Sequence, residues 1–154
     1  MNVAVLTVSD RASRGVYTDE AGPLVRRVIV ENGGRVVAIG LVPDERDQIA
    51  SILLAMSEDP EIDLIVTTGG TGLGARDVTP EATRDVIERE APGIAEAMRA
   101  AGMRITPNAA LSRQVCGTRD RTLIINLPGS PKAAAESLGA VIDILPHAVE
   151  MLRA

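Results

Sequence analysis

The sequence predicts an α/β fold, a single three-layer, doubly wound domain over residues 1–154 with a mostly parallel sheet. Short, nearly continuous apolar runs such as Asn2–Val8 and Thr122–Leu127 are typical of strands that are buried on both faces. These runs alternate with longer segments of helical periodicity, as they do in parallel sheets. A chain of 154 residues also fits one ordinary domain.

The first half of the chain is predicted to run strand, helix, strand, helix, strand. Gly33 and Gly34 end the first helix, and Asp44 is placed to cap the second. We expect strands at Asn2–Val8, Arg35–Val42 and Ile62–Thr68, a first helix at Ala21–Asn32, and a second helix with the apolar face Ile49, Ile52, Leu53 and Met56.

The second half is predicted to contain more helix. One helix is expected from Thr79 to about Glu90, because Thr79-Pro80-Glu81 supplies a cap, a first-turn proline and an acidic residue. A short helix at Pro92–Ala101 and the strand Thr122–Leu127 follow. Pro131–Leu152 closes the chain as one long helix or as a helix kinked at Pro146.

The composition excludes several kinds of partner and chemistry. A net charge of −5 and an aromatic content of 1% are unsuited to nucleic-acid binding. No stretch approaches the roughly 20 apolar residues of a membrane span, and the N-terminus lacks a signal-peptide pattern, so we expect a cytoplasmic protein. A single cysteine, Cys116, and a single histidine, His147, cannot form a disulfide or a zinc cluster, which favours structural roles for both.

Candidate ligand-binding residues follow the predicted strands. Ligands of doubly wound sheets bind outside the carboxyl ends of the strands, where four loops should meet: Ser9–Asp10, Asp44, Gly69–Asp77 and Pro128–Lys132. Ser9 and Asp10 offer a hydroxyl group and a carboxylate, although a solvated loop explains them equally well. Helix capping alone would explain Asp44.

The strongest local signal is TTGGTGLGARDVTPEAT at residues 67–83. Four glycines between Gly69 and Gly74 exceed what a turn needs and favour a phosphate cradle built from backbone amides. It is not a standard P-loop, because Ala75-Arg76 stand where that motif requires Lys-Ser/Thr. Nor is it the usual dinucleotide motif, because the next helix begins too late, at Thr79.

Asp77 is the acidic residue closest to this predicted cradle. A carboxylate beside bound phosphates is repulsive unless it holds Mg²⁺ or orients a reacting group, which makes Asp77 the first candidate for a catalytic and metal-binding residue. The alternative is a turn aspartate whose side chain caps its own loop.

LPGSPKA at residues 127–133 provides a second possible anion site, at the start of a helix. Lys132 is the only lysine among 16 basic residues, which favours a place where a compact ammonium group is needed. Ser112-Arg113 is a weaker polar candidate. Because no Ser/His/Asp or Cys/His set is assembled, the residues favour phosphoryl or nucleotidyl transfer by positioning and metal electrostatics.

The order of these motifs resembles the MogA/MoaB family of molybdenum cofactor biosynthesis proteins. The resemblance rests on VSDRAS at Val8, PDE at Pro43, the long glycine-rich motif at Thr67, LSRQ at Leu111 and LPGSPKA at Leu127. It runs almost end to end, and the long motif in this order with the others is highly specific.

The resemblance implies a molybdopterin adenylyltransferase with ATP and molybdopterin as substrates, Mg²⁺ as cofactor and pyrophosphate as by-product. By carry-over, Asp77 would be the essential carboxylate that positions Mg²⁺ and the attacking phosphate, and Asp44 would be a second functional aspartate. The substrates would contact Ser9, Asp10, Gly69, Gly70, Thr71, Gly72, Gly129, Ser130 and Lys132. The resemblance also implies a homotrimer or homohexamer and leaves room for a partner protein that inserts molybdate.

Two other functions stay open from the sequence. The first is a non-catalytic module that binds molybdopterin or serves as a scaffold, against which the presence of both Asp44 and Asp77 argues. The second is a related nucleotide hydrolase, a role in which this fold occurs within larger proteins.

Overall fold

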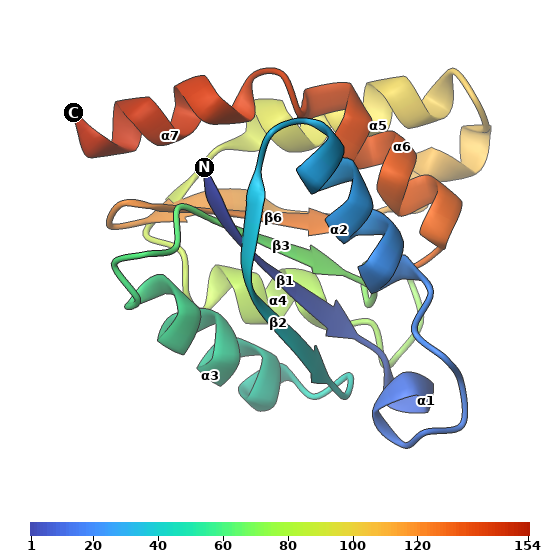
Figure 1. Ribbon diagram of the computed structural model, residues 1–154. Helices are drawn as coiled ribbons and strands as arrows, with labels where there is room; N and C mark the ends of the chain where they lie inside the picture. The colour runs from blue at the N-terminus through green and yellow to red at the C-terminus, as the bar shows by residue number, and fades with distance from the viewer.

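The fold is built on one six-stranded sheet with the strand order β2-β1-β3-β6-β5-β4, in a computed structural model that describes all of residues 1–154 (Figure 1). Four strands run parallel, namely β1 (Asn2–Val8), β2 (Arg35–Val42), β3 (Leu64–Thr68) and β6 (Thr122–Leu127). Two short strands, β5 (Cys116–Arg119) and β4 (Arg89–Glu90), extend the sheet with antiparallel pairings. The predicted doubly wound α/β architecture with a mostly parallel sheet is confirmed.

Helices cover both faces of the sheet and make three layers (Figure 1). One face carries α2 (Ala21–Glu31), α5 (Pro92–Met103), α6 (Pro131–Val141) and α7 (Leu145–Arg153), and the other carries α3 (Arg46–Ser57) and α4 (Thr79–Arg84). The short α1 (Asp10–Ser13) and the 3-10 helix η1 (Pro107–Leu111) lie in loops. None of the helices combines the length and the apolar character needed to cross a membrane.

Each face of the sheet has its own apolar core, of 17 residues on the α2 side and 11 on the α3 side. Alternate residues of β1, β3 and β6 enter the two cores, which explains why these strands are apolar at nearly every position. The edge strand β2 differs, since its burial alternates and Val37, Ile39 and Leu41 stay exposed on one face.

The prediction that the helix beginning at Thr79 continues to about Glu90 is wrong, because α4 ends at Arg84. After it the chain turns to pair with β5: the amide of Glu88 donates to the Thr118 carbonyl and that of Ala91 to the Cys116 carbonyl, both at 2.8 Å. The strand β5 was not predicted, because its sequence CGTR is short and has no apolar alternation.

Neither predicted helix cap forms. Glu45 rather than Asp44 is the N-cap of α3, and the Asp44 carboxylate turns instead toward the loop after β1. Val78 is the N-cap of α4, so Thr79 is already the first helical residue, and its buried hydroxyl oxygen has no partner. At Asp44, a contact with another loop thus takes precedence over local capping.

The closing segment forms two helices rather than one. The first, α6, ends at Val141, and the second, α7, begins at Leu145, with Pro146 in its first turn. A proline is tolerated there because a first-turn amide has no partner within the helix.

The strand order creates a topological switch point between β1 and β3. The chain leaves β1 toward the helical layer that contains α2, whereas it leaves β3 toward the opposite layer, which contains α4. The loops after these neighbouring strands therefore diverge, and such a switch point is where open α/β sheets bind ligands.

Candidate active site

A cavity of about 190 Å³ opens at this switch point, at the carboxyl ends of β1 and β3. Six of the residues predicted for the site line it, namely Ser9, Asp44, Gly69, Gly70, Asp77 and Gly129. The remaining wall consists of Thr7, Val8, Ala12, Tyr17, Asp19, Ala21 and Thr68. The predicted catalytic pair, Asp44 and Asp77, therefore shares one cavity.

Asp10 and Asp44 fasten the loops after β1 and β2 to each other. The Asp10 amide donates to Asp44 Oδ2 at 2.8 Å, and the Asp44 amide donates to Asp10 Oδ1 at 2.9 Å. Arg76 adds two bonds to the Asp10 carboxylate, both at 3.0 Å, and one to Glu45 at 2.8 Å. The hydrogen bonds from Arg76 hold the pKa of Asp10 below its usual range. Asp10 thus links the loops after β1 and β2 without forming part of the cavity wall.

The electrostatic setting of Asp44 is the reverse of that of Asp10. Burial raises the pKa of Asp44 above its usual range, against the stabilising bond from the Asp10 amide, and the negative charges of Asp10 and Asp77 raise it further. Its Oδ1 atom accepts no hydrogen bond within the chain. A half-buried carboxylate with a free oxygen and acidic neighbours would gain stability from a bound cation.

Asp77 caps its own loop, as the alternative interpretation predicted, and keeps one carboxylate oxygen free. Its Oδ2 accepts a hydrogen bond from the Gly74 amide at 2.9 Å, so the side chain does cap its own loop. Its Oδ1 has no hydrogen-bond partner in the chain and remains available on a residue of the cavity wall. A Cβ atom on Gly72 or Gly74 would lie within 3.0 Å of Asp77 Oδ2, so these glycines make room for the carboxylate.

Gly69 and Gly70 are required by close packing. Both have positive φ, and an added Cβ would lie 2.1 Å from the Val8 carbonyl oxygen at Gly69 and 2.3 Å from Thr79 Oγ1 at Gly70. The Gly69 amide donates to the Leu127 carbonyl and is therefore not free for a ligand. Several other amides of this loop have no acceptor in the chain and could bind an anion, among them those of Gly70, Thr71 and Gly72.

The turn after β6 offers further free amides but not the predicted side chains. Ser130 caps α6 through a bond from the Ala133 amide at 3.5 Å, and the amides of Gly129 and Ser130 have no acceptor. The Lys132 side chain is 82% exposed and lies 3.8 Å from Glu136. Five predicted site residues thus lie outside the cavity wall: Asp10, Thr71, Gly72, Ser130 and Lys132.

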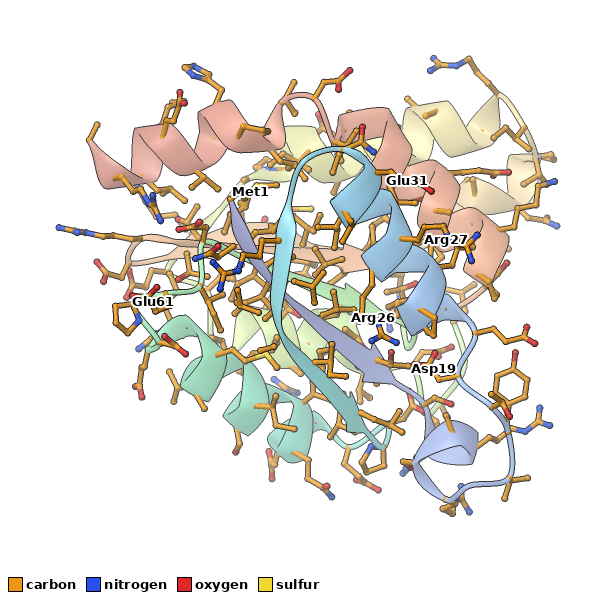
Figure 2. All side chains as sticks on the ribbon, in the orientation of Figure 1. Met1, Asp19, Arg26, Arg27, Glu31 and Glu61 are labelled. Carbon is orange, nitrogen blue, oxygen red and sulfur yellow. The ribbon has the colours of Figure 1, made fainter.

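Sequence reasoning missed several residues of the site. Asp19 accepts a hydrogen bond from the Thr7 hydroxyl at 2.8 Å and one from the Gly22 amide at 2.9 Å, at the meeting point of β1 and α2 (Figure 2). Tyr17 lines the same cavity, with the Arg11 guanidinium 5.4 Å from the centre of its ring. The one available signal was a lone aromatic residue in a loop at the ligand-binding edge.

The structural roles predicted for Cys116 and His147 are confirmed. Cys116 is buried, and burial raises the pKa of its thiol to about 12, so it is not a nucleophile near neutral pH. His147 lies on α7, where its exposed side chain is 3.6 Å from Glu150. Neither residue lines the cavity.

The donor set of the cavity suits Mg²⁺. Asp44 and Asp77 each present one oxygen without a hydrogen-bond partner, and no group of three His, Cys, Asp or Glu side chains gathers anywhere as a self-sufficient metal site. Magnesium is commonly bound by one or two carboxylates together with substrate phosphates and water. The residues present therefore fit a metal that arrives with a phosphate ligand.

Known proteins share this fold and much of this sequence. The family model described as "Probable molybdopterin binding domain" matches residues 4–147. Molybdopterin adenylyltransferase from Helicobacter pylori strain J99 is 44% identical over 99% of this chain and 88% of its own length, and the Escherichia coli K12 enzyme is 40% identical over 93% and 74%.

Solved structures agree with the sequence comparisons. The molybdopterin biosynthesis enzyme MoaB from Thermus thermophilus superimposes with a TM-score of 0.93 and 52% identity, over 98% of this chain and 95% of that one. A structure of MogA gives the same TM-score at 39% identity over 99% of both chains. The chain therefore belongs to the MogA/MoaB family of molybdopterin-binding domains in molybdenum cofactor biosynthesis.

Proposed function

We propose that this protein is a molybdopterin adenylyltransferase, which transfers AMP from ATP to the phosphate of molybdopterin and releases pyrophosphate. The observation that carries the proposal is the placement of Asp44 and Asp77 in one cavity, next to a loop with free backbone amides. Family membership and relatives of 40–44% identity that have this activity in their names support it.

The reaction needs no covalent enzyme intermediate. A phosphate oxygen of molybdopterin attacks the α-phosphorus of ATP, a new P–O–P bond forms, and the bond to the β-phosphate breaks so that pyrophosphate leaves. Such a transfer depends on alignment and on compensation of charge, which agrees with a cavity wall that contains no Cys, His or Lys side chain.

The chain's own groups divide these tasks. We infer that the free amides of the loops after β3 and β6 hold phosphate oxygens, since backbone N–H groups bind anions without adding a mobile charge. The free oxygens of Asp77 and Asp44 would hold Mg²⁺, which, when bound, neutralises negative charge on the phosphates. Without a cation, the two carboxylates would repel the same phosphates.

The rival functions differ from transfer in their products. Purified chain is incubated with ATP and Mg²⁺, with and without molybdopterin, and pyrophosphate and phosphate are quantified. Adenylyl transfer predicts pyrophosphate release that depends on molybdopterin. Release of either product without molybdopterin would favour a hydrolase, and binding of molybdopterin without any product would favour the binding module.

We also propose that the protein is a homo-oligomer. The exposed β2 residues Ile39 and Leu41 are 62% and 46% accessible, and Val30 of α2 is 59% accessible. Part of this apolar surface lines a groove of about 900 Å³ between α2 and β2, beside Arg26, Arg27 and Glu31 (Figure 2). This groove is larger than the cavity at the strand ends, but it holds no carboxylate pair. It exposes apolar side chains of an edge strand, a kind of surface that commonly binds another protein chain. We therefore propose that a second copy of the chain occupies it.

A further inference from the structure

Arg113 contacts the glycine-rich loop from a distant part of the chain. It lies between η1 and β5, and its own amide donates to the Thr71 carbonyl at 2.8 Å. Its guanidinium donates from Nε to the Gly72 carbonyl at 2.8 Å and from Nη2 to the Asp77 carbonyl at 2.7 Å. One residue thus holds three carbonyl groups of the loop that contains Asp77.

These contacts set the direction of other backbone groups. Every peptide bond in the chain is trans, so a carbonyl group and the N–H of the next residue point in opposite directions. When Arg113 draws a carbonyl toward itself, the following amide is turned away from it. The three amides oriented in this way donate to no acceptor in the chain, and they belong to Gly72, Leu73 and Val78.

The charge of Arg113 is balanced within the same cluster. Glu81 of α4 pairs with Nη1, and although burial opposes ionisation, this bond holds the pKa of Glu81 below its usual range. The Arg113 side chain is 35% exposed. A planar guanidinium group can serve two carbonyls and a carboxylate together, whereas a lysine ammonium cannot reproduce this fixed geometry.

We propose that Arg113 is a positioning residue for phosphate binding. It fixes the loop so that an array of free amides and the Asp77 carboxylate keep one arrangement for the substrate phosphates. Four glycines between positions 69 and 74 make this loop intrinsically flexible. Hydrogen bonds from Arg113 can therefore reduce the conformational entropy that the loop would lose on binding phosphate. The role rests on the proposed function, because it assumes that the loop binds phosphate groups.

The test measures phosphate binding apart from turnover. Inorganic pyrophosphate with Mg²⁺ is titrated calorimetrically into the full chain and into Arg113→Met and Arg113→Lys. The matched control is Arg46→Met, since Arg46 also pairs with a carboxylate, through two hydrogen bonds to Asp85 at 2.7 and 2.8 Å, but contacts no carbonyl of the loop. We expect at least about tenfold weaker binding in both Arg113 variants and unchanged binding in the control.

A second readout separates positioning from general stability. Amide NMR resonances of Gly72, Leu73 and Val78 should shift when pyrophosphate is added to the wild type, and these shifts should be lost in Arg113→Lys under conditions where urea titration shows it to be folded. The proposal would be overturned if a folded Arg113 variant bound pyrophosphate with wild-type affinity and showed the same amide shifts. It would also be overturned if these amide resonances of the wild type did not shift when pyrophosphate is added. If the wild type binds pyrophosphate through these amides but makes no molybdopterin-AMP, adenylyl transfer is wrong and the role of Arg113 stands.

Discussion

At the scale of single residues, the candidate site is defined by two carboxylates, each with one oxygen that accepts a hydrogen bond and one that accepts none. In both Asp44 and Asp77, Oδ2 is fixed by a loop amide and Oδ1 has no partner in the chain. The fixed oxygen determines where the free one lies. This arrangement pre-organises two metal-binding oxygens, at the cost of holding two negative charges close together.

Replacement of Asp77 by asparagine tests this arrangement. Asn keeps the shape of the side chain and can still accept the bond from the Gly74 amide, so we expect the free energy of unfolding to change by less than about 1 kcal/mol. It removes the charge that holds the cation, so adenylyl transfer should fall by about 100-fold or more. Urea denaturation and the rate of molybdopterin-AMP formation check the two expectations. Near-normal turnover would return Asp77 to a purely structural role in its turn.

Asp44 predicts a pH dependence of stability. Its pKa is raised in the folded state, so the protonated form favours folding. That contribution is fully present below the unfolded pKa of about 3.9 and is lost as the pH rises through the folded-state value. Asp44→Asn keeps an acceptor for the Asp10 amide and does not ionise, so its stability relative to wild type should improve from pH 4 to pH 7. Its transfer activity should be reduced.

Urea titrations of Asp44→Asn and wild type at pH 4 and pH 7 measure this difference. If the stability of Asp44→Asn relative to wild type decreased from pH 4 to pH 7, burial would not be the origin of the raised pKa of Asp44.

The sequence located the two carboxylates that line the cavity, but it also pointed to Ser130 and Lys132, which lie outside the cavity wall, and it did not reveal contacts between distant parts of the chain. Asp77 and Asp44 could be identified because each follows a predicted strand at the ligand-binding edge. The contacts of Arg113 with Gly72 and of Arg76 with Asp10 join residues 41 and 66 positions apart, and no local pattern encodes them.

At the scale of elements, the glycine-rich loop depends on packing as well as on ligand binding. Gly69→Ala would place a Cβ 2.1 Å from a backbone oxygen at φ +107°, so we expect a loss of about 2–4 kcal/mol in stability. Gly139→Ala in α6 is the control, because nothing lies within 4 Å and helix propensity should add about 0.5–1 kcal/mol. Urea denaturation of both variants checks the contrast. Equal effects would show that the packing argument is wrong.

The same scale shows which elements a sequence can reveal. β1, β3 and β6 are buried on both faces, and this leaves a continuous apolar run that needs no knowledge of neighbours. β4 and β5 form at the sheet edge from short polar segments, and only their pairing with each other and with β6 makes them strands. The early end of α4 has the same cause, since its expected last residues belong to β4.

At the scale of the whole molecule, the uncovered face of β2 predicts self-association. Ile39→Asp should shift the protein toward monomer in sedimentation equilibrium, because a charge there is costly once a second copy covers the groove. Ile105→Asp is the control, since Ile105 is 57% exposed but does not line this groove. The mass of the wild type distinguishes a trimer from a hexamer. A monomeric wild type, or an Ile39 variant with unchanged mass, would contradict this interface.

The most direct test of the central claim follows the adenylyl group itself. ATP that carries a label on its α-phosphorus is mixed with Mg²⁺, molybdopterin and an excess of the purified protein for a single turnover. The account predicts that the label moves into molybdopterin-AMP in equal amount to the pyrophosphate released, and that Asp77→Asn forms both products at least about 100-fold more slowly. Label that remains in ATP although molybdopterin is bound, or that appears as free AMP, would contradict adenylyl transfer by this protein.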